Sequence, residues 1–298
     1  MIHLLLLPFL CILTTAAVSQ PTISPPLPQH PRLLSSPPSS SSATPPSTPV
    51  PAHWALLQRQ NPSRLSCFLG QTGTVEDMLH GLNFASATAG IIFTSGSELG
   101  QHVSLSQQIQ QFTDTYQQFV LSMGQQAAVD LISNSVLYIS IGINDYIHYY
   151  LRNESNVQNV YFPWSFNRFL ASTVKQEIKN LYSINVRKVV VMGLPPIGCA
   201  PHYLCSVVCS HTNAVNMLFL SSGFKVTTDA CCGLGDYKGF LMCLSPDMAC
   251  SNALGHIWWD QFHPTDTVNA ILADNVWNGL HTKMCYPMNL EDVVASTY

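Results

Sequence analysis

Beyond about Trp54, the chain alternates between helical and buried-strand patterns, and this order limits the possible folds more than any other feature. Apolar residues at spacings of three and four predict amphipathic helices, whereas short continuous apolar runs predict buried strands. Helices are expected over 105–119, 166–181 and 268–276, and strands over 136–141 and 189–192. This alternation favours an α/β fold, with a mostly parallel sheet covered by helices on both faces. Functional loops of such sheets lie beyond the carboxyl ends of the strands.

The first 19 residues have the pattern of a secretory signal peptide. Leu4 to Leu13 is an apolar run, and Ala17-Val18-Ser19 offers the small residues that a signal peptidase requires. The run is too short for a membrane span of about 20 residues, and no run long enough follows. We therefore expect a secreted protein, extracellular or in the cell wall, without a transmembrane segment.

Residues 20–55 are expected to form a disordered linker. Positions 20–51 hold 11 Pro and 8 Ser, with Arg32 as the only charged residue. Such a stretch buries too little apolar surface to offset the entropy of ordering the backbone. The folded domain, and all of the chemistry, is therefore expected within 56–298.

Composition excludes two classes of protein. Charged residues make up only 9% of the chain and hydrophobic residues 47%, so a disordered charged protein is excluded. With 12 Lys+Arg against 16 Asp+Glu, the chain lacks the basic clusters that neutralise phosphates, and no nucleic-acid partner is expected.

Cysteine usage fits an oxidising compartment, where most thiols pair. The chain has 10 Cys, and loss of Cys11 with the signal peptide would leave an odd number. The unpaired thiol is expected at Cys205 or Cys209. Pairs are expected among Cys199, Cys231, Cys232, Cys243, Cys250 and Cys285. The sequon Asn153-Glu154-Ser155 fits a secreted glycoprotein.

The first loop of chemical interest is Gly142-Ile143-Asn144-Asp145, directly after the predicted strand 136–141. A carboxamide N–H at this place can point at a developing oxyanion, a device that contributes about 3 kcal/mol where it has been measured. The alternative is an Asn-Asp turn that only connects two elements, with Asp145 bonded to its own turn. Spacing alone favours that alternative.

The second loop is Trp258-Trp259-Asp260-Gln261-Phe262-His263-Pro264. Pro264 restricts His263 to extended geometry ahead of the last helix. Asp260 can turn back to accept from the His263 ring, which is the orienting half of a nucleophilic triad. An isolated Asp-x-x-His is also common in surface turns. Trp164, Trp258, Trp259 and Trp277 are expected in the core, with a ligand groove as the alternative.

Together with further runs, these loops resemble the plant GDSL-type esterases and lipases of the SGNH hydrolase superfamily. The matching runs are 83–90, 142–145, 193–201, 229–233 and 260–265, in the family's order. The resemblance covers most of the chain from about Gly70 to Leu290. It implies a flavodoxin-like three-layer α/β/α fold, and hydrolysis of carboxylic esters or lipids through a serine acyl-enzyme. It implies no cofactor and no metal.

The resemblance also implies roles for individual residues. His263 would be the general base, Asp260 its orienting partner, and Asn144 an oxyanion donor. The family's oxyanion glycine aligns with Thr88, and Gly90 lies just beyond. A backbone N–H survives the change from glycine to threonine, but the backbone becomes more restricted.

The chain departs from the family in two places. The family's nucleophile lies in a Gly-Asp-Ser-Leu motif after the first strand, and this chain has no such motif. The Pro/Ser-rich segment instead runs almost directly into Gly70, so the first strand is expected to be missing. A helix–strand unit is also expected to be missing between Tyr203 and Asp229. No nucleophile is identified, and the chain is expected to be incomplete and inactive.

Three functions remain open at this point. The first is an active secreted hydrolase with a small ester or lipid substrate. The second is a non-catalytic relative that binds ester or polysaccharide ligands, or a truncated product that does not fold. The third is a metal protein, because Cys205, Cys209, His211, Cys231 and Cys232 are ligand types.

Overall fold

The computed structural model describes residues 10–14, 66–68, 75–79, 81–152, 156–204, 223–279 and 284–296. The chain forms two compact units, and each is described by itself. The first unit comprises Met1–Ala17, Pro51–Ile197 and Ala270–Tyr298, and the second comprises Val18–Val50 and Gly198–Asn269. The expected linker, the sequon and the ligand types Cys205, Cys209 and His211 lie outside the described residues.

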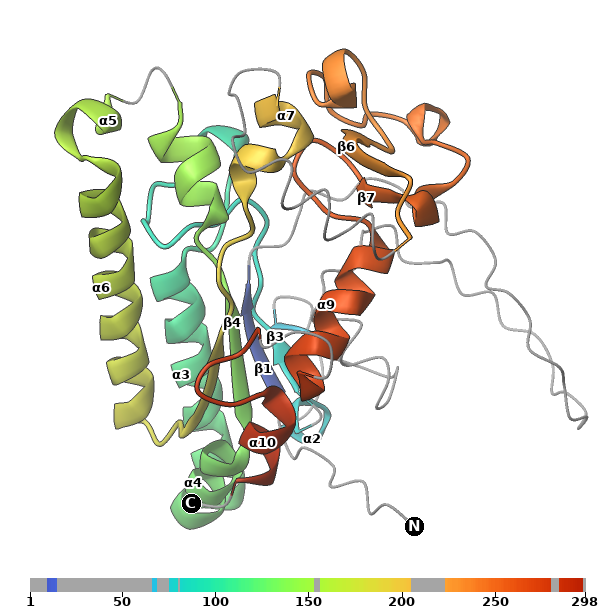
Figure 1. Cartoon of the computed structure of the whole chain (residues 1–298). Coiled ribbons are helices and arrows are strands. Elements are labelled where there is room, and N and C mark those ends of the chain that lie inside the picture. Colours follow the sequence, from blue (N-terminus) through green and yellow to red (C-terminus); the bar gives the residue numbers. More distant parts are fainter. Residues whose placement is uncertain are drawn as a thin grey trace, which may run out of the picture. The chain divides into compact units, whose positions relative to one another are not determined.

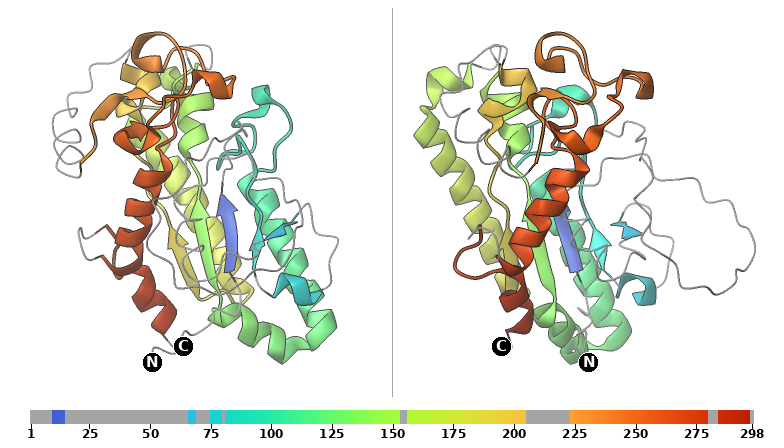
Figure 2. Two further views of the ribbon diagram at one scale, coloured as in Figure 1. Left: turned by 90° about the vertical axis from the view of Figure 1, so that its right-hand side faces the viewer. Right: turned by 45° about the vertical axis from the view of Figure 1, so that its right-hand side comes forward.

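The first unit is built on a five-stranded parallel sheet, as the strand–helix alternation predicts. Its strands, in spatial order, are β2 (Ser66–Cys67), β3 (Leu82–Asn83), β1 (Leu10–Thr14), β4 (Val136–Ser140) and β5 (Lys188–Val191). The left view of Figure 2 shows β3, β1 and β4 side by side. The α/β fold class is therefore confirmed.

The strand β1 is formed by residues that the sequence pattern assigns to a signal peptide. Leu10 to Thr14 pair in parallel with Val136 to Ser140, and Cys11 and Ile12 pair with β3. In the full-length chain, these residues thus form a strand between β3 and β4, whereas the sequence assigns them to a signal peptide. The physical reason for the difference is that a signal peptide and a buried parallel strand are both continuous apolar runs. Removal of residues 1–19 as a signal peptide stays a prediction. That the family's own first strand is missing also stays a prediction.

Helices cover both faces of this sheet, which makes three layers (Figure 1). On one face, Leu137 and Ile139 of β4 pack in a core with α3 (Leu105–Met123) and α6 (Pro163–Ser183). On the other face, Val136 and Tyr138 pack with α10 (Leu290–Ala295). Alternate residues of β4 therefore face opposite layers, as strand geometry requires. The helices expected over 105–119 and 166–181 are confirmed.

The first unit also has shorter helices. They are α2 (Val75–Met78), α4 (Gln125–Asn134), α5 (Val157–Val160) and a π-helical turn over Asp145–Tyr150. The helix α9 (Asp266–Asn278), which confirms the helix expected over 268–276, begins in the second unit and ends in the first. No described helix is long and apolar enough to cross a bilayer.

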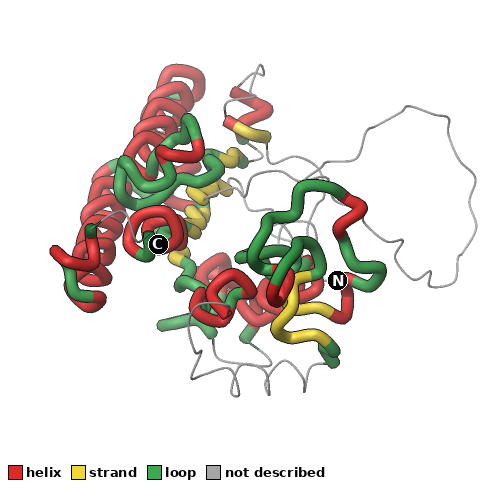
Figure 3. Tube along the Cα trace, turned by 90° about the horizontal axis from the view of Figure 1, so that it is seen from above, coloured by secondary structure: helices red, strands yellow, loops and turns green. Residues whose placement is uncertain are grey.

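The second unit has little regular structure, and Figure 3 shows it mainly as loops. It contains the helix α7 (Pro201–Leu204) and a parallel pair of strands, β6 (Val226–Ala230) and β7 (His256–Trp258). Two disulfides join neighbouring segments, Cys231 to Cys250 and Cys232 to Cys243. Together with the buried Trp259, these cysteines form the small core of this unit. A helix–strand unit is expected to be missing between Tyr203 and Asp229. Residues 205–222 of this segment lie outside the described residues, so its absence stays a prediction.

Candidate active site

In the first unit, the loop after β4 holds the candidate oxyanion donor. Gly142 adopts φ +119°, a conformation that favours glycine and lets the chain turn sharply at the end of the strand. Asn144, two residues later, is buried, and its Nδ2 donates a hydrogen bond to the carbonyl of Ala89 at 3.0 Å. This hydrogen bond holds the Asn144 side chain in place. Because the amide nitrogen carries two hydrogens, a second N–H remains that could donate to an oxyanion.

Ala89 belongs to a loop that includes the other two candidate oxyanion residues, Thr88 and Gly90. Gly90 passes so close to its neighbours that an added Cβ would lie 2.7 Å from Asp145 Oδ1 and 2.6 Å from Ser95 Oγ. Thr88 adopts φ +63°, in the left-handed region. This region is unfavourable for a β-branched residue, so the structure gives a physical reason for a glycine at this position.

Replacing Thr88 by glycine is therefore expected to stabilise the protein. The left-handed conformation costs a non-glycine residue about 1–2 kcal/mol, and glycine loses about 0.5–1 kcal/mol more than alanine in conformational entropy. The free energy of unfolding of Thr88→Gly should therefore rise by about 0.5–1 kcal/mol in denaturant titration. Thr88→Ala is the control, since alanine keeps the strain and should bring no such gain. Equal stability of both variants would contradict the role of backbone strain.

Asp145 fixes this loop from the other side, a role that its local sequence does not indicate. Its Oδ2 accepts from the backbone N–H of Ile91 at 2.8 Å, and its Oδ1 accepts from that of Ile92 at 2.8 Å. These partners lie 53 and 54 residues away, so Asp145 is more than a local turn residue. Burial raises the pKa of Asp145 to about 6, although the hydrogen bonds act in the opposite direction.

In the second unit, Asp260 and His263 form the contact that their spacing predicts. His263 Nδ1 lies 2.8 Å from Asp260 Oδ1 and 2.9 Å from Oδ2. Asp260 Oδ1 also accepts from the backbone N–H groups of Phe262 and His263, at 3.0 and 2.8 Å. The ring nitrogen that faces Asp260 is Nδ1, which leaves Nε2 as the nitrogen that can meet a substrate. The His263 side chain keeps 42% of its surface exposed, so the ring is accessible.

The loop that carries this pair is held closed by the backbone. The N–H of Trp259 donates to the carbonyl of His263 at 2.7 Å, and that of Thr265 donates to the carbonyl of Ile257 at 2.8 Å. Gln261, whose role no sequence pattern indicates, anchors the outside of the loop. Its Nε2 donates to the carbonyls of Gly239 and Phe240, at 3.0 and 3.2 Å. Only the folded chain identifies this role, because Gly239 lies 22 residues away.

The ionisation of the pair follows from its contacts. Burial alone would raise the pKa of Asp260, but the charge of His263 and the hydrogen bonds together lower it. Burial would likewise lower the pKa of His263, but the carboxylate of Asp260 raises it. The carboxylate therefore stays ionised and stabilises an imidazolium, as the orienting acid of a triad must.

This balance predicts the effect of Asp260→Asn. Removal of the carboxylate removes the charge and the hydrogen bond that raise the pKa of His263, so this pKa should be lower in Asp260→Asn than in the parent. An NMR titration of the His263 ring protons measures this change directly. Asp247→Asn, which neutralises an exposed carboxylate in the same unit, is the control and should leave the pKa unchanged. A His263 pKa that is equal in parent and Asp260→Asn would contradict the pairing.

The five candidate residues thus form two groups. Asn144, Thr88 and Gly90 lie together in the first unit, and Asp260 and His263 lie together in the second. The convergence of these groups in one cleft stays a prediction. Within the described part of the chain, no serine hydroxyl is hydrogen-bonded to His263, whose ring nitrogen contacts go to Asp260.

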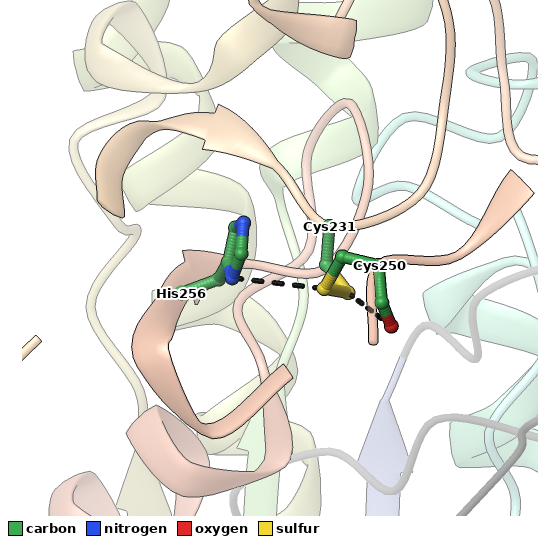
Figure 4. Close-up of side chains that lie close together, drawn as sticks. All are labelled: Cys231, Cys250 and His256. Atoms are coloured by element: carbon green, nitrogen blue, oxygen red, sulfur yellow. Dashed lines mark hydrogen bonds between the residues drawn. A yellow bond between two sulfur atoms is a disulfide. The ribbon is translucent and has the colours of Figure 1, made fainter. Parts of the chain in front are cut away.

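The metal hypothesis is wrong for the cysteines that the structure describes. Cys231, Cys250 and His256 do lie together, with His256 Nδ1 3.6 Å from Cys250 Sγ (Figure 4). However, Cys231 is bonded to Cys250 and Cys232 to Cys243. A metal needs thiolates, and a disulfide sulfur is not one.

The expected pairing of cysteines is largely confirmed. Of the six named cysteines, Cys199 is also disulfide-bonded, whereas Cys285 is a free thiol. The leftover thiol predicted at Cys205 or Cys209 stays a prediction.

Comparison with known proteins defines the class. The family model for GDSL-like lipases and acylhydrolases matches residues 56–276, which is well over half of the chain. Together with the parallel α/β sheet, this match places the chain in a class of proteins whose members are hydrolases of ester bonds. It belongs to the GDSL-like lipase/acylhydrolase family.

Curated relatives agree with this assignment. One GDSL esterase/lipase of Arabidopsis thaliana is 29% identical in an alignment 263 residues long, which covers 73% of this chain and 68% of the relative. A second from the same plant is 28% identical in an alignment 269 residues long, which covers 76% of this chain and 72% of the relative. A third, GDSL esterase/lipase 7, is 29% identical over 273 residues, with 76% and 74% covered. The resemblance stated from the sequence motifs is thus confirmed.

Proposed function

We propose that this chain is a secreted GDSL-type protein that keeps the base and the oxyanion donor of an ester hydrolase but lacks the nucleophile. The observation that carries the proposal is the Asp260–His263 pair, with Nδ1 held at 2.8 Å and the ring still exposed. It is the arrangement that a general base requires. The missing element is the serine whose proton Nε2 would remove.

The chemistry of a complete site would be as follows. His263 Nε2 takes the proton of a serine hydroxyl, and the serine oxygen attacks the carbonyl carbon of a small ester or a lipid. Asp260 holds the imidazolium that forms. The Asn144 amide, with the backbone N–H groups near Thr88 and Gly90, donates to the oxyanion. Without the serine, the acyl-enzyme cannot form, and the remaining groups can only bind and polarise an ester.

Two observations support secretion of the mature protein. The first 19 residues have the signal pattern, and the described disulfides of the second unit need an oxidising compartment to persist. We therefore place the protein outside the cell or in the cell wall.

An ester assay on the purified protein tests this proposal. With a short-chain p-nitrophenyl ester, the parent should hydrolyse substrate no faster than a control protein without a site. The His263→Ala variant should match the parent, because triad members act as a unit. If the parent instead turns over substrate at about 1–1000 per second and His263→Ala abolishes this rate, the proposal is wrong. The nucleophile would then be sought first among the serines of 63–66.

A further inference from the structure

An exposed aromatic surface lies where α5 meets the start of α6. It consists of Val160, Tyr161, Phe162, Trp164 and Phe169, and we call it the α5–α6 corner. Phe162 is 64% exposed and Trp164 63% exposed, so the expectation of a buried Trp164 is wrong. Trp258 and Trp259, in contrast, are buried as expected. Figure 1 shows α5 beside the beginning of α6, at the outer edge of the helical layer.

The rings of this corner are already ordered. Phe162 and Trp164 stack with their centroids 4.8 Å apart and their planes 10° apart. Tyr161 and Phe169 stack at 6.0 Å. Pro163, at the first position of α6, fixes the backbone between the stacked pair. Little side-chain entropy is therefore lost when this surface binds a partner.

Charge and residue type indicate the kind of partner. From Asn156 to Phe169 the chain has no carboxylate, and its only charged residue is Arg168, which is exposed. Tryptophan and tyrosine have an apolar body and a polar edge, and they are enriched where lipid meets water. The described segment 156–169 thus combines exposed aromatic rings with one positive and no negative charge, which complements the phosphate-bearing surface of a phospholipid bilayer.

The size of the corner argues against the other occupants. A stable protein interface takes about 800 Å² and 20–30 residues from each partner, whereas this corner has five exposed apolar side chains. A lipid surface needs only a few inserted rings. Phe162 and Trp164 stack on each other, so each ring has one face covered. This leaves fewer open ring faces on which a sugar could stack.

The corner is connected to the loop of the candidate oxyanion donor within the same unit. Phe166 lies buried beneath it and contacts Tyr161 at 6.3 Å between ring centroids. The same ring packs on Tyr150 at 4.6 Å and on Tyr146 at 5.5 Å. Tyr146 directly follows Asp145 in the chain. One aromatic cluster therefore joins the corner to the segment that follows Asn144.

We propose that the α5–α6 corner docks the protein on the surface of a phospholipid bilayer, with Phe162 and Trp164 as the inserted side chains. The inference concerns binding alone, and it holds whether or not the chain hydrolyses esters. Docking would bring a water-insoluble ester to the unit that holds Asn144.

Co-sedimentation with phosphatidylcholine vesicles tests the proposal. The parent should sediment with the vesicles. The double variant Phe162→Ser/Trp164→Ser should bind at least about tenfold more weakly, because it lacks the two large rings whose transfer from water into the bilayer favours binding. Leu121→Ser is the matched control, because Leu121 is 87% exposed on α3 but lies outside the corner. It should bind as the parent does. Trp164→Phe should keep binding while it loses the blue shift of tryptophan emission that vesicles induce in the parent.

Three results would overturn the proposal. One is a parent that does not sediment with vesicles, and another is a double variant that binds as well as the parent while its unfolding temperature is unchanged. The third is a parent that is a dimer in analytical ultracentrifugation and becomes a monomer in the double variant, which would make the corner a contact between copies. Vesicle binding by His263→Ala, which cannot act as a base, keeps this result separate from the ester assay.

Discussion

Placing Gly-Asp-Ser-Leu at residues 15–18 is expected to raise the rate of ester hydrolysis by at least about a thousandfold. The reason is that removal of one triad member lowers the rate of such hydrolases by this factor or more. The changes are Thr15→Gly, Ala16→Asp, Ala17→Ser and Val18→Leu, in a protein that keeps residues 1–19. Thr14, the last residue of β1, pairs in parallel with Ser140, the last residue of β4. The graft thus enters the chain right after β1, whose end lies beside the strand that leads to Asn144.

Two controls make this experiment specific. The same graft with Ala17 left unchanged has every substitution except the nucleophile, and it should stay at the rate of the parent. His263→Ala in the full graft should remove the gained activity. A full graft that folds but stays at the parent rate would show that His263 and Asn144 do not reach a serine at this position.

The second large effect is expected from Asp145→Ala. This substitution leaves the backbone N–H groups of Ile91 and Ile92 without their acceptor in a largely buried place. Each unsatisfied buried group costs about 1–3 kcal/mol, so the free energy of unfolding should fall by about 3 kcal/mol. Denaturant titration measures this change. Asp114→Ala is the control, since Asp114 is an exposed carboxylate on α3 that accepts a hydrogen bond from Gln110 on the same helix.

The pH dependence of the same variant adds a second measurement. The pKa of Asp145 is raised from 3.8 to about 6, so the folded protein holds this proton more tightly than the unfolded chain does. The resulting stabilisation is full below about pH 4 and is lost as the pH rises through about 6. Asp145→Ala lacks this contribution, so the gap in stability between parent and variant should be wider at pH 4 than at pH 8. A gap within about 0.5 kcal/mol at both pH values would contradict the anchoring role of Asp145.

Local pattern was enough to predict the two longest helices and two of the five strands of the first unit. The apolar runs at β4 and β5 and the helical spacing in α3 and α6 appear where the periodicity indicates. The contact between Asp260 and His263 was equally predictable from the sequence. The two residues are only three positions apart, and Pro264 restricts the backbone of His263. In each case the interacting residues are close in the chain, so short-range geometry decides the outcome.

Other features depended on partners that are distant in the chain. The sequence shows Asp145 but not Ile91 and Ile92, which the loop brings to its carboxylate. It shows ten cysteines but not that Cys231 bonds to Cys250, with Cys232 bonded to Cys243. The sequence tells which residue types are present. Which cysteines bond and which N–H groups meet a carboxylate depend on the segments that lie side by side in the folded chain.

The sequence by itself therefore determined the fold class, the family and the short-range Asp260–His263 pair. Only the tertiary structure decided that Leu10–Thr14 can act as a central strand and that Trp164 is exposed. The physical reason is that an apolar residue has several favourable environments, among them a sheet, a core and a lipid surface. Its neighbours in space, which local periodicity does not specify, decide which of these it takes.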